Sequence, residues 1–343
     1  MNLLCYADLQ ATDGSERCFA DPSVPLQHQR VVQFYKSLLE IYKAHKCVGL
    51  IDLGDTTDDR SSIPVPTIDA VINGLQPFPD SEWNVKIIGN HEQFLRDTSI
   101  NVGSLFQSKF TVIPACGVIE HEDLAMVFAA YPESHDTLTQ TLKSTAFEYR
   151  HKRLVLFGHF QTVGAMMASG EALTGVPKQA LKPFKFGLLG HIHTPQTVME
   201  NIHYIGSPFQ QDFGEAGEDK RVAVLNTDTL QVTWVPMTGF PCYHKVSLYE
   251  FEKSVDANSE DRFRVVIKNQ KEATRYFQHP LAHRASATYD YEVKTPEKPE
   301  GVQDDWSFDT VLKRYLNRVP PNASGVALTA EEMTEIGIQI ANE

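Results

Sequence analysis

The sequence lacks any apolar run that approaches the ~18 residues a membrane-spanning helix needs, so no membrane segment is expected. Cysteine is scarce: the 343 residues contain 5, dispersed along the chain and without a CxxC pair. This pattern argues against a disulfide framework and a zinc ribbon, and free thiols are typical of a reducing compartment. The opening MNLLCYADLQ also lacks the basic segment that begins a signal peptide. We therefore expect a cytoplasmic protein.

Net positive charge is also absent: the sequence has 31 Lys and Arg residues and 44 Asp and Glu residues, which give a formal charge of −13. Lys and Arg make the contacts to nucleic-acid phosphates, so this balance argues against a general polyanion binder. No Walker A pattern occurs, so the chain is not expected to be an ATPase. What is present is 42% hydrophobic residues, which suits a globular protein, and a length that predicts two domains at about 150 residues each.

Short apolar runs that end at a polar, ligand-type residue recur along the chain. The residues that end them are Asp8, Asp55, Asn90 with His91, His159, and His191 with His193. Such runs, rich in Val, Ile, Leu and Phe, are typical of buried strands. Each polar residue alone could be a cap, a turn residue or a buried core histidine. Together, as strand ends of one sheet, they would bring oxygen and imidazole donors to a single edge, where active sites of α/β sheets lie.

The spacing of the other apolar residues predicts the fold class. Val31, Phe34, Leu38, Ile41 and Tyr42 recur at helical spacing, which predicts an amphipathic helix over 28–46. Strands and helices therefore alternate in the first half, as in an α/β architecture. Between 201 and 237, IHYIGS, VAVLNTD and VTWVPM read as strands with short turns, as in a second sheet. We expect an α/β fold built as a two-sheet β-sandwich flanked by helices.

The pooled donors are carboxylate, amide and imidazole groups without a thiolate, which suits Mn²⁺, Fe²⁺ or Zn²⁺. They exceed what one catalytic ion with an open position uses, but they fit two ions roughly 3.5–4 Å apart, bridged by the Asp55 carboxylate. Two such ions can turn a bound water into a nucleophile and stabilise charge on a phosphoryl group. His91 remains as an acid for the leaving oxygen or as a clamp on the phosphate.

Five ordered motifs resemble those of the calcineurin-like metallophosphoesterases over roughly residues 1–210. They are Asp8-x-Gln10, GDTTDD from Gly54, GNHE from Gly89, Gly158-His159, and GHIH from Gly190. YIGSPFQQDFGEAGEDK (204–220), GDTTDDR and the segment 160–170 further resemble the SbcD-type DNA double-strand-break nucleases, in particular the shorter, phage-encoded members.

The resemblance implies α-β-β-α layers, a small α+β capping domain, and DNA phosphodiester hydrolysis with two divalent ions. Mn²⁺ is the expected ion, with Mg²⁺, Fe²⁺ or Zn²⁺ as alternatives. It implies one ion on Asp8, Gln10, Asp55 and His193, another on Asp55, Asn90, His159 and His191, and His91 and Asp55 as catalytic residues. It also implies a homodimer that works with an SbcC-type coiled-coil ATPase in a bacterial cell or a phage-infected host.

Gln10 stands where the family usually has histidine. A glutamine offers a neutral amide oxygen, which is a harder and usually weaker donor for Mn²⁺ or Zn²⁺ than an imidazole nitrogen. Gln10 could bind through its carbonyl oxygen, bind through a water, or leave the first site weak or empty. We favour a working but more weakly held first ion, because every other donor is present.

The composition changes after residue 238, so we expect a metallophosphoesterase domain over 1–238 and a capping domain over 239–295. Between 262 and 284 the basic residues stand against one acid, Glu272; they include Arg262, Arg264, Lys268, Lys271 and Arg275. Such a run is usually a solvated face, and the alternative is a DNA-binding surface. After a linker at 294–301, two helices over 303–343 are expected. They would either pack on their own domain or dock the ATPase partner.

Three functions remain open from the sequence. The leading one is a DNA exonuclease or endonuclease subunit that acts in DNA recombination and repair. The second is a phosphatase or phosphodiesterase for a small or protein-borne phosphate, against which the cap and the terminal helices argue. The third is a scaffold with weak catalysis that bridges an ATPase to DNA ends. Retention of His91, which has no obvious ligand role, argues against the scaffold.

Overall fold

The computed structural model describes residues 1–94 and 100–290. Two sheets of six strands each form its centre, in the orders β12-β11-β1-β2-β3-β4 and β5-β6-β7-β8-β10-β9. The first contains β1 (Asn2–Tyr6), β2 (Gly49–Asp52), β3 (Val85–Ile87), β4 (Thr111–Ile113), β11 (Arg221–Asn226) and β12 (Gln231–Pro236). The second contains β5 (Cys116–His121), β6 (Leu124–Ala129), β7 (Arg153–His159), β8 (Phe186–Gly190), β9 (Gln196–Met199) and β10 (Ile202–Tyr204). Strands β1 to β4 are parallel, as are β6, β7, β8 and β10.

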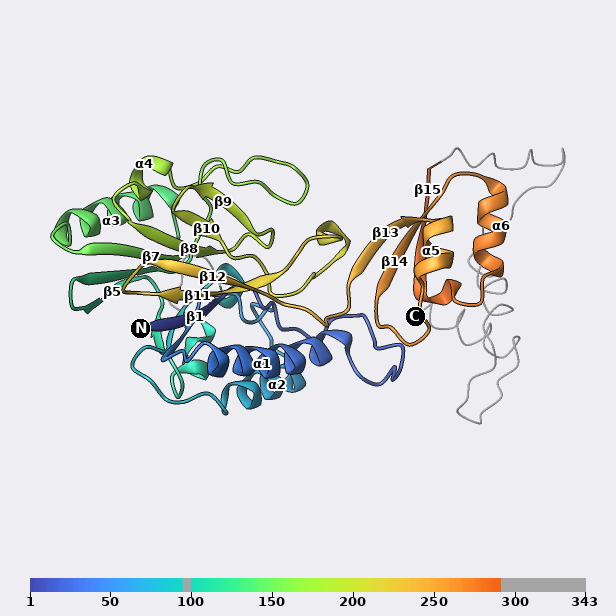
Figure 1. Cartoon of the computed structure of the whole chain (residues 1–343), viewed down its shortest axis with the longest axis horizontal. Coiled ribbons are helices and arrows are strands. Elements are labelled where there is room, and N and C mark those ends of the chain that lie inside the picture. The colour runs from blue at the N-terminus through green and yellow to red at the C-terminus, as the bar shows by residue number, and fades with distance from the viewer. Residues whose placement is uncertain (95–99, 291–343) are drawn as a thin grey trace, which may run out of the picture. The chain divides into compact units, whose positions relative to one another are not determined.

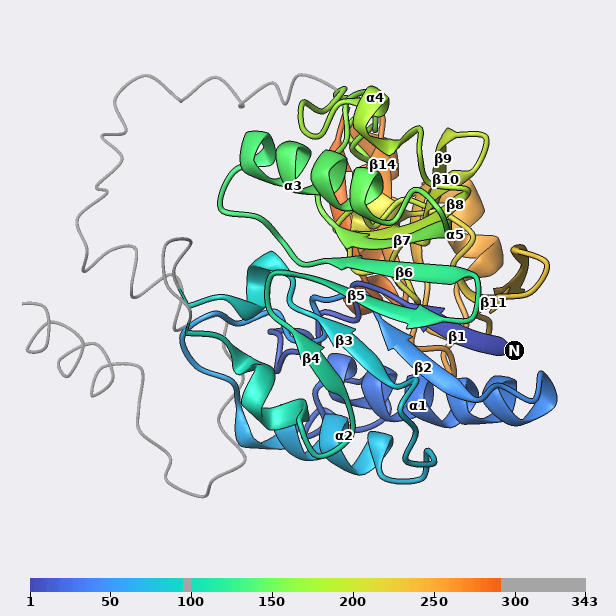
Figure 2. The ribbon, with the colours of Figure 1, turned by 90° about the vertical axis from the view of Figure 1, so that its left-hand side faces the viewer.

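The two sheets pack against each other between two layers of helices (Figure 1, Figure 2). Helices α1 (Leu26–Ala44) and α2 (Val65–Leu75) cover the first sheet, and α3 (His135–Glu148) and α4 (Lys178–Leu181) cover the second. Because successive side chains of a strand point to opposite faces, Leu3 of β1 enters the core between the sheets and Leu4 the core under α1. Burial of such a side chain stabilises the fold by roughly 1.5–3 kcal/mol. The predicted two-sheet α/β fold is confirmed.

The helix predicted over 28–46 is α1, and its buried side chains include Val31, Phe34, Leu38 and Tyr42. The remaining short helices are η1 (Asn90–Glu92), η2 (Val102–Phe106), η3 (Phe213–Glu215) and η4 (Ala282–Arg284). None of the helices in the described ranges combines the length and apolar character that crossing a membrane requires.

Two expectations about strand placement were wrong. The strands between 201 and 237 do not share a sheet, because β10 joins the second sheet whereas β11 and β12 extend the first. β11 pairs antiparallel with β1, so the chain passes from one sheet to the other after β10. The donor-bearing strand ends also belong to two sheets: β1, β2 and β3 to the first, β7 and β8 to the second. Pairing partners depend on contacts distant in sequence, which a local apolar pattern does not encode.

A third sheet of parallel strands lies in the region 239–295. It consists of β13 (Tyr243–Ser247), β14 (Arg262–Ile267) and β15 (Ala285–Tyr289), with α5 (Leu248–Ser254) and α6 (Gln270–Gln278). Phe263, Val265 and Ile267 of β14 form a small core with Phe251 of α5 and Tyr276 of α6. Both helices therefore cover the same face of this sheet. The linker expected at 294–301 and the helices expected at 303–343 lie outside the described residues.

Candidate metal centre

The chain turns sharply where the donor residues follow their strands. Asp8, Gln10, Asp55 and His191 all have positive φ, at 53°, 51°, 54° and 88°. This region is unfavourable for residues with a side chain, and such strain is typical of functional sites. The turns are held together by backbone hydrogen bonds, from the Asp8 N–H to the Gly54 carbonyl (3.0 Å) and from the Gln10 N–H to the Asp55 carbonyl (2.9 Å).

Gly89 permits the close approach of two of these turns. A Cβ atom at Gly89 would lie 2.0 Å from the Asp55 Oδ1 atom and 2.5 Å from the Asp55 backbone nitrogen. The glycine before the Asn90–His91 pair is thus needed because the Asp55 turn packs directly against it.

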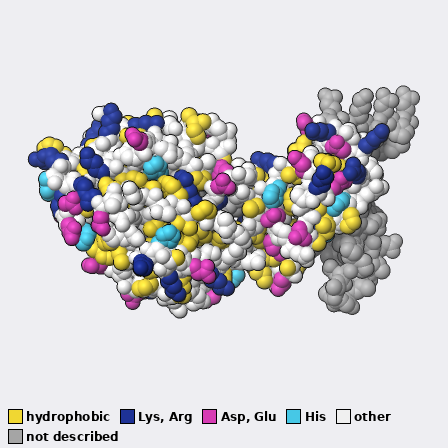
Figure 3. All heavy atoms as spheres, in the orientation of Figure 1, with side chains coloured by type: hydrophobic (Ala, Val, Ile, Leu, Met, Phe, Trp, Pro, Cys, Tyr) yellow, Lys and Arg dark blue, Asp and Glu magenta, His cyan; other side chains and the backbone are white. Residues whose placement is uncertain are grey.

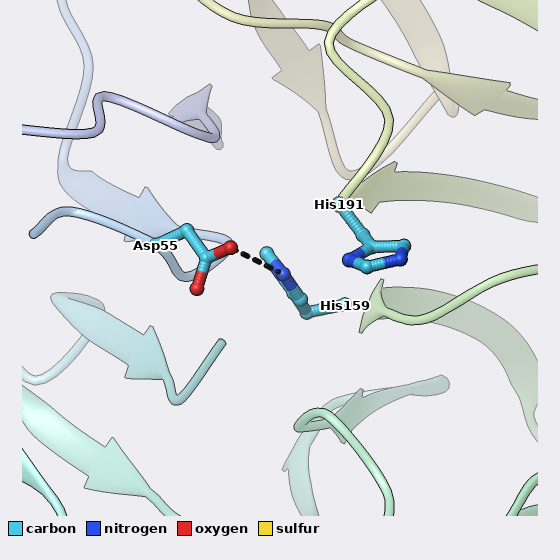
Figure 4. Close-up of side chains that lie close together, drawn as sticks. All are labelled: Asp55, His159 and His191. Atoms are coloured by element: carbon cyan, nitrogen blue, oxygen red, sulfur yellow. Dashed lines mark ion pairs between the residues drawn. The ribbon is translucent and has the colours of Figure 1, made fainter. Parts of the chain in front are cut away.

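Four predicted ligands converge at the junction of the two sheets. The Asn90 Oδ1 atom lies 2.6 Å from His191 Nδ1 and 3.2 Å from His159 Nε2, which in turn lies 3.2 Å from Asp55 Oδ2. Figure 4 shows Asp55, His159 and His191 side by side; their ligand atoms all lie within 4.8 Å of one another. Separations of about 3 Å are those of adjacent donors around one small ion with ligand distances near 2.1 Å. The donors therefore fit a divalent metal ion.

The ring orientations suit the same role. His159 is fully buried, and its Nδ1 atom lies 2.6 Å from the Leu53 carbonyl oxygen. His193 Nδ1 lies 2.8 Å from Glu215 Oε1. A hydrogen bond from one ring nitrogen leaves the lone pair of the other nitrogen available to an ion, as in most histidine metal sites.

Charges in the site depend strongly on one another. Burial disfavours ionised His159, but the Asp55 carboxylate outweighs this effect and raises the pKa of His159 to about 9. Burial likewise opposes ionisation of Asp55, but His159 outweighs it and lowers the pKa of Asp55 to about 2. Burial raises the pKa of Asp8 to about 6 and lowers that of His191 to about 3. Buried carboxylates thus hold a proton on His159. A bound cation can replace that proton, because metal ligands release protons when the metal binds.

The other predicted set, Asp8, Gln10, Asp55 and His193, is assembled less tightly. Gln10 donates from Nε2 to Asp55 Oδ2 at 3.2 Å, and Asp8 accepts the His191 backbone N–H at 2.9 Å. The Gln10 Oε1 atom is buried and accepts no hydrogen bond from the residues that the structure describes. An unpaired buried acceptor is unfavourable, and an ion beside Asp55 would satisfy it. The donor types of this set suit a second ion, to which Gln10 would contribute an amide oxygen.

His91 lies beside the donors without joining them. Its backbone N–H donates to Asp55 Oδ1 at 2.8 Å, and its Nδ1 atom lies 2.9 Å from Asp58 Oδ1. The hydrogen bond with Asp58 raises the pKa of His91 to about 9, against the effect of burial. His91, Gln10 and His193 line a cavity of about 370 Å³. The geometry thus places the His91 imidazole at the wall of that cavity, beside the donors.

Sequence reasoning missed the residues that hold the donors in place. Glu92 is fully buried and accepts the backbone N–H groups of Gly89 (3.0 Å), Asp55 (3.1 Å) and Thr56 (3.0 Å). Lys86, also fully buried, pairs with Glu92 at 2.8 Å and with Asp52 at 2.9 Å. A lysine inside the apolar run VKIIG and a glutamate directly after Asn90 and His91 were the available signals.

The basic residues near the third sheet occupy different environments. Arg262, predicted to contact DNA, is 7% exposed, and its guanidinium lies 3.8 Å from the centre of the Phe19 ring and pairs with Glu260. This burial argues against Arg262 as a DNA contact. Arg264 is half-buried over the Phe213 ring, Arg275 pairs with Glu252, and Lys268 and Lys271 are exposed.

No family model matches the sequence. The chain is 20% identical over 300 residues to "Exonuclease subunit 1" of Enterobacteria phage T4, which covers 83% of this chain and 85% of that protein. It is 24% identical over 218 residues to "Putative phosphoesterase 078R" of Invertebrate iridescent virus 3, or 61% of this chain and 62% of that protein. Among solved structures, a dimetal phosphatase from Danio rerio gives a TM-score of 0.41 at 11% identity, with 69% of this chain and 99% of that chain covered. The predicted resemblance is confirmed: the chain is a distant homologue of a phage exonuclease subunit and of a phosphoesterase.

Proposed function

We propose that this homologue of an exonuclease subunit is a two-metal-ion phosphodiesterase that hydrolyses DNA. The observation that carries the proposal is the convergence of Asp55, Asn90, His159 and His191 at the junction of two sheets, with His91 held beside them. A two-metal nuclease can use both features, because the donors hold the ions and a separate group can act on the phosphate. The phage relative is named as an exonuclease subunit, which supports a role within an assembly.

Asp55, Asn90, His159 and His191 would hold one ion, and Asp8, Gln10, Asp55 and His193 the other. We propose that both ions are Mn²⁺. Two such ions would supply a water nucleophile at neutral pH and would stabilise charge on the phosphoryl oxygens. His91 contributes what the ions do not. Since Asp58 keeps it protonated, its free ring nitrogen can donate to a phosphate oxygen or to the leaving oxygen.

The face of the third sheet that lies opposite its helices would provide a surface for the DNA backbone. Lys245, Arg264 and Ser286 are paired across the three strands, so their side chains share one face. Phe263 and Val265 point to the other face, under α5 and α6. Arg264 lies over the ring of Phe213, which lines the same cavity as His91. We propose that Lys245 and Arg264 contact DNA that enters this cavity, in place of the buried Arg262.

We further propose that the chain works as a homodimer with an SbcC-type ATPase, in the cytoplasm of a bacterial cell or a phage-infected host. The test of the function is cleavage of single- and double-stranded DNA by the purified chain in Mn²⁺, Mg²⁺ or EDTA. We expect Mn²⁺-dependent cleavage that falls by roughly 10²–10⁴-fold in His91→Ala, the usual contribution of an acid–base group. The exposed His151 provides a control, His151→Ala, which should cleave normally.

The outcomes separate the alternatives. Hydrolysis of bis-p-nitrophenyl phosphate without cleavage of DNA, even with the ATPase partner added, would favour a small-substrate phosphodiesterase. No hydrolysis of either substrate with any ion or with the partner would favour a scaffold.

A further inference from the structure

Each of the three histidines among the proposed ligands has one ring nitrogen held from outside the site. The Leu53 carbonyl holds His159 at 2.6 Å, and Glu215 holds His193 at 2.8 Å. The third, His191, lies with its Nε2 atom 3.0 Å from Gln161 Nε2. The first two partners can only accept a hydrogen bond, whereas the amide of Gln161 can donate or accept. His191 is thus the one of these histidines whose ring proton is not fixed by the chemistry of its partner.

Gln161 is placed by a loop whose base is closed on both sides. The buried Tyr204 hydroxyl donates to the Phe160 carbonyl at 2.8 Å, and the Val176 N–H donates to the Gln161 carbonyl at 2.8 Å. Gly175, with φ +156°, allows this closure, because a Cβ atom there would lie 2.2 Å from the Gln161 carbonyl oxygen. The backbone of Gln161 is therefore held in place, and its side chain, which includes the terminal amide, keeps the freedom to rotate.

The contacts of His191 depend on which way this amide faces. With Nε2 toward the ring, Gln161 donates to His191 Nε2, so the ring proton sits on Nδ1 and is donated to Asn90 Oδ1, 2.6 Å away. An ion bound at His191 Nδ1 requires that this nitrogen lose its proton. If Nε2 gains a proton at the same time, the ring stays neutral and Gln161 must present Oε1, which a half-turn of the amide achieves.

We propose that Gln161 is a positioning residue whose amide rotates as an ion binds, and so sets the tautomer of His191 and the ion affinity. The inference rests on the proposed function, because it concerns the same donor set. Because the loop from 160 to 176 places Gln161, this loop would influence how tightly Asp55, Asn90, His159 and His191 bind an ion. Partners of ligating histidines typically contribute 10–100-fold to metal affinity.

Two substitutions of Gln161 separate positioning from structural support. Gln161→Leu removes both hydrogen-bonding functions, and we expect Mn²⁺ affinity measured by calorimetry to fall 10–100-fold. Gln161→Glu can only accept from His191 Nε2, so it should bind Mn²⁺ at least as tightly as the unmodified chain. The matched control is Gln196→Leu, because Gln196 pins Met166 in the same loop through bonds of 2.8 Å and has no contact with His191 among those described. Its Mn²⁺ affinity should not change.

Long-range ¹H–¹⁵N spectra of the His191 ring give a second readout. We expect the proton on Nδ1 in the metal-free chain and on Nε2 in the Zn²⁺-loaded chain, with Nε2 favoured in both states in Gln161→Glu. Equal affinities of the unmodified chain and Gln161→Leu would overturn the proposal, as would a tautomer unaffected by Zn²⁺. A lower melting temperature in Gln161→Leu with unchanged affinity would reduce Gln161 to structural support. If the unmodified chain binds ions and shows the tautomer change but cleaves no DNA, the proposed function fails while this inference stands.

Discussion

Gln10 is the residue at which this site departs from the metallophosphoesterase pattern. Its Oε1 atom is buried and has no hydrogen-bond partner within residues 1–94 and 100–290, and its Nε2 atom donates to Asp55. An acceptor without a partner beside a shared carboxylate is consistent with a ligand that binds through oxygen. Because imidazole nitrogen is a stronger donor for Mn²⁺ than an amide oxygen, Gln10 should weaken the ion that it would share with Asp8 and His193, and leave the other ion unaffected.

Gln10→His should therefore tighten the weaker of two Mn²⁺ binding events. We expect about a tenfold gain in affinity, equivalent to about 1.4 kcal/mol, with the tighter event unchanged. Calorimetric titration with Mn²⁺ resolves the two events. Gln76→His, at an exposed position after α2, controls for an added surface histidine. Identical isotherms for Gln10→His and the unmodified chain would mean that residue 10 does not reach the ion.

At the residue scale, the sequence predicted metal ligands from the chemistry of their side chains. It did not predict residues whose role depends on a neighbour in the folded chain. His159 and His191 were selected because imidazoles after apolar runs are typical ligands. Gln161 and Glu215 carry no such pattern, because their roles come from folding onto His191 and His193. The burial of Arg262 was missed for a related reason. The residues around it in the sequence do not show that Phe19 and Glu260 enclose its side chain.

At the scale of elements, strand ends bring the donors together, but they do so from two sheets. Apolar runs predicted each of the five strands that carry a donor, because buried strands of this kind are rich in Val, Ile, Leu and Phe. The partition into sheets was not predictable, because β11 and β12 pair with β1 after the chain has already built the second sheet. The connection from β10 to β11 therefore matters: it contains η3, whose Glu215 fixes His193.

Glu215 ties this connection to the site through buried contacts. It is 4% exposed, accepts from His193 at 2.8 Å, and pairs with the buried Lys220 at 2.7 Å. Although burial opposes its ionisation, His193 and Lys220 lower the pKa of Glu215 to about 2. Glu215→Gln leaves Lys220 without its more buried partner, and breaking a buried pair in this way typically costs about 3–5 kcal/mol of unfolding free energy.

The pH dependence of the unfolding free energy tests whether Glu215 is the ionised partner of His193 and Lys220. A carboxyl whose pKa is lowered on folding contributes its full stability above its unfolded pKa, near 4.5, and loses it as the pH falls toward 2. Urea unfolding at pH 7 and at pH 3 should thus show a smaller difference between the unmodified chain and Glu215→Gln at the lower pH. Glu218→Gln is the control, because Glu218 also pairs with Lys220 but is more exposed; we expect a loss under about 1 kcal/mol. Equal losses in the two variants would contradict the assignment.

At the scale of the whole molecule, a chain with a net charge of −13 must bind a polyanion for the proposed function to hold. Figure 3 shows positive and negative side chains interspersed on the visible surface, so no single-sign field attracts DNA from that side. The positive charge must then be local. Two bound divalent ions would add about four charges at the cavity, and Lys245 and Arg264 lie on the face of the third sheet opposite its helices.

The salt dependence of DNA binding distinguishes that face from the helices on the other side. Each phosphate contact contributes about 0.9 to the slope of log affinity against log salt concentration. Lys245→Gln and Arg264→Gln should each reduce the slope by about that amount, whereas Lys271→Gln on α6, whose helix packs on the opposite face, should leave it unchanged. Fluorescence anisotropy of a labelled duplex between 50 and 200 mM salt, in EDTA to prevent cleavage, gives the slopes. A reduced slope in Lys271→Gln alone would move the DNA path to the helical face. His91 and Phe213 line one cavity, and Arg264 lies over the Phe213 ring, so that result would also separate DNA binding from the proposed metal centre.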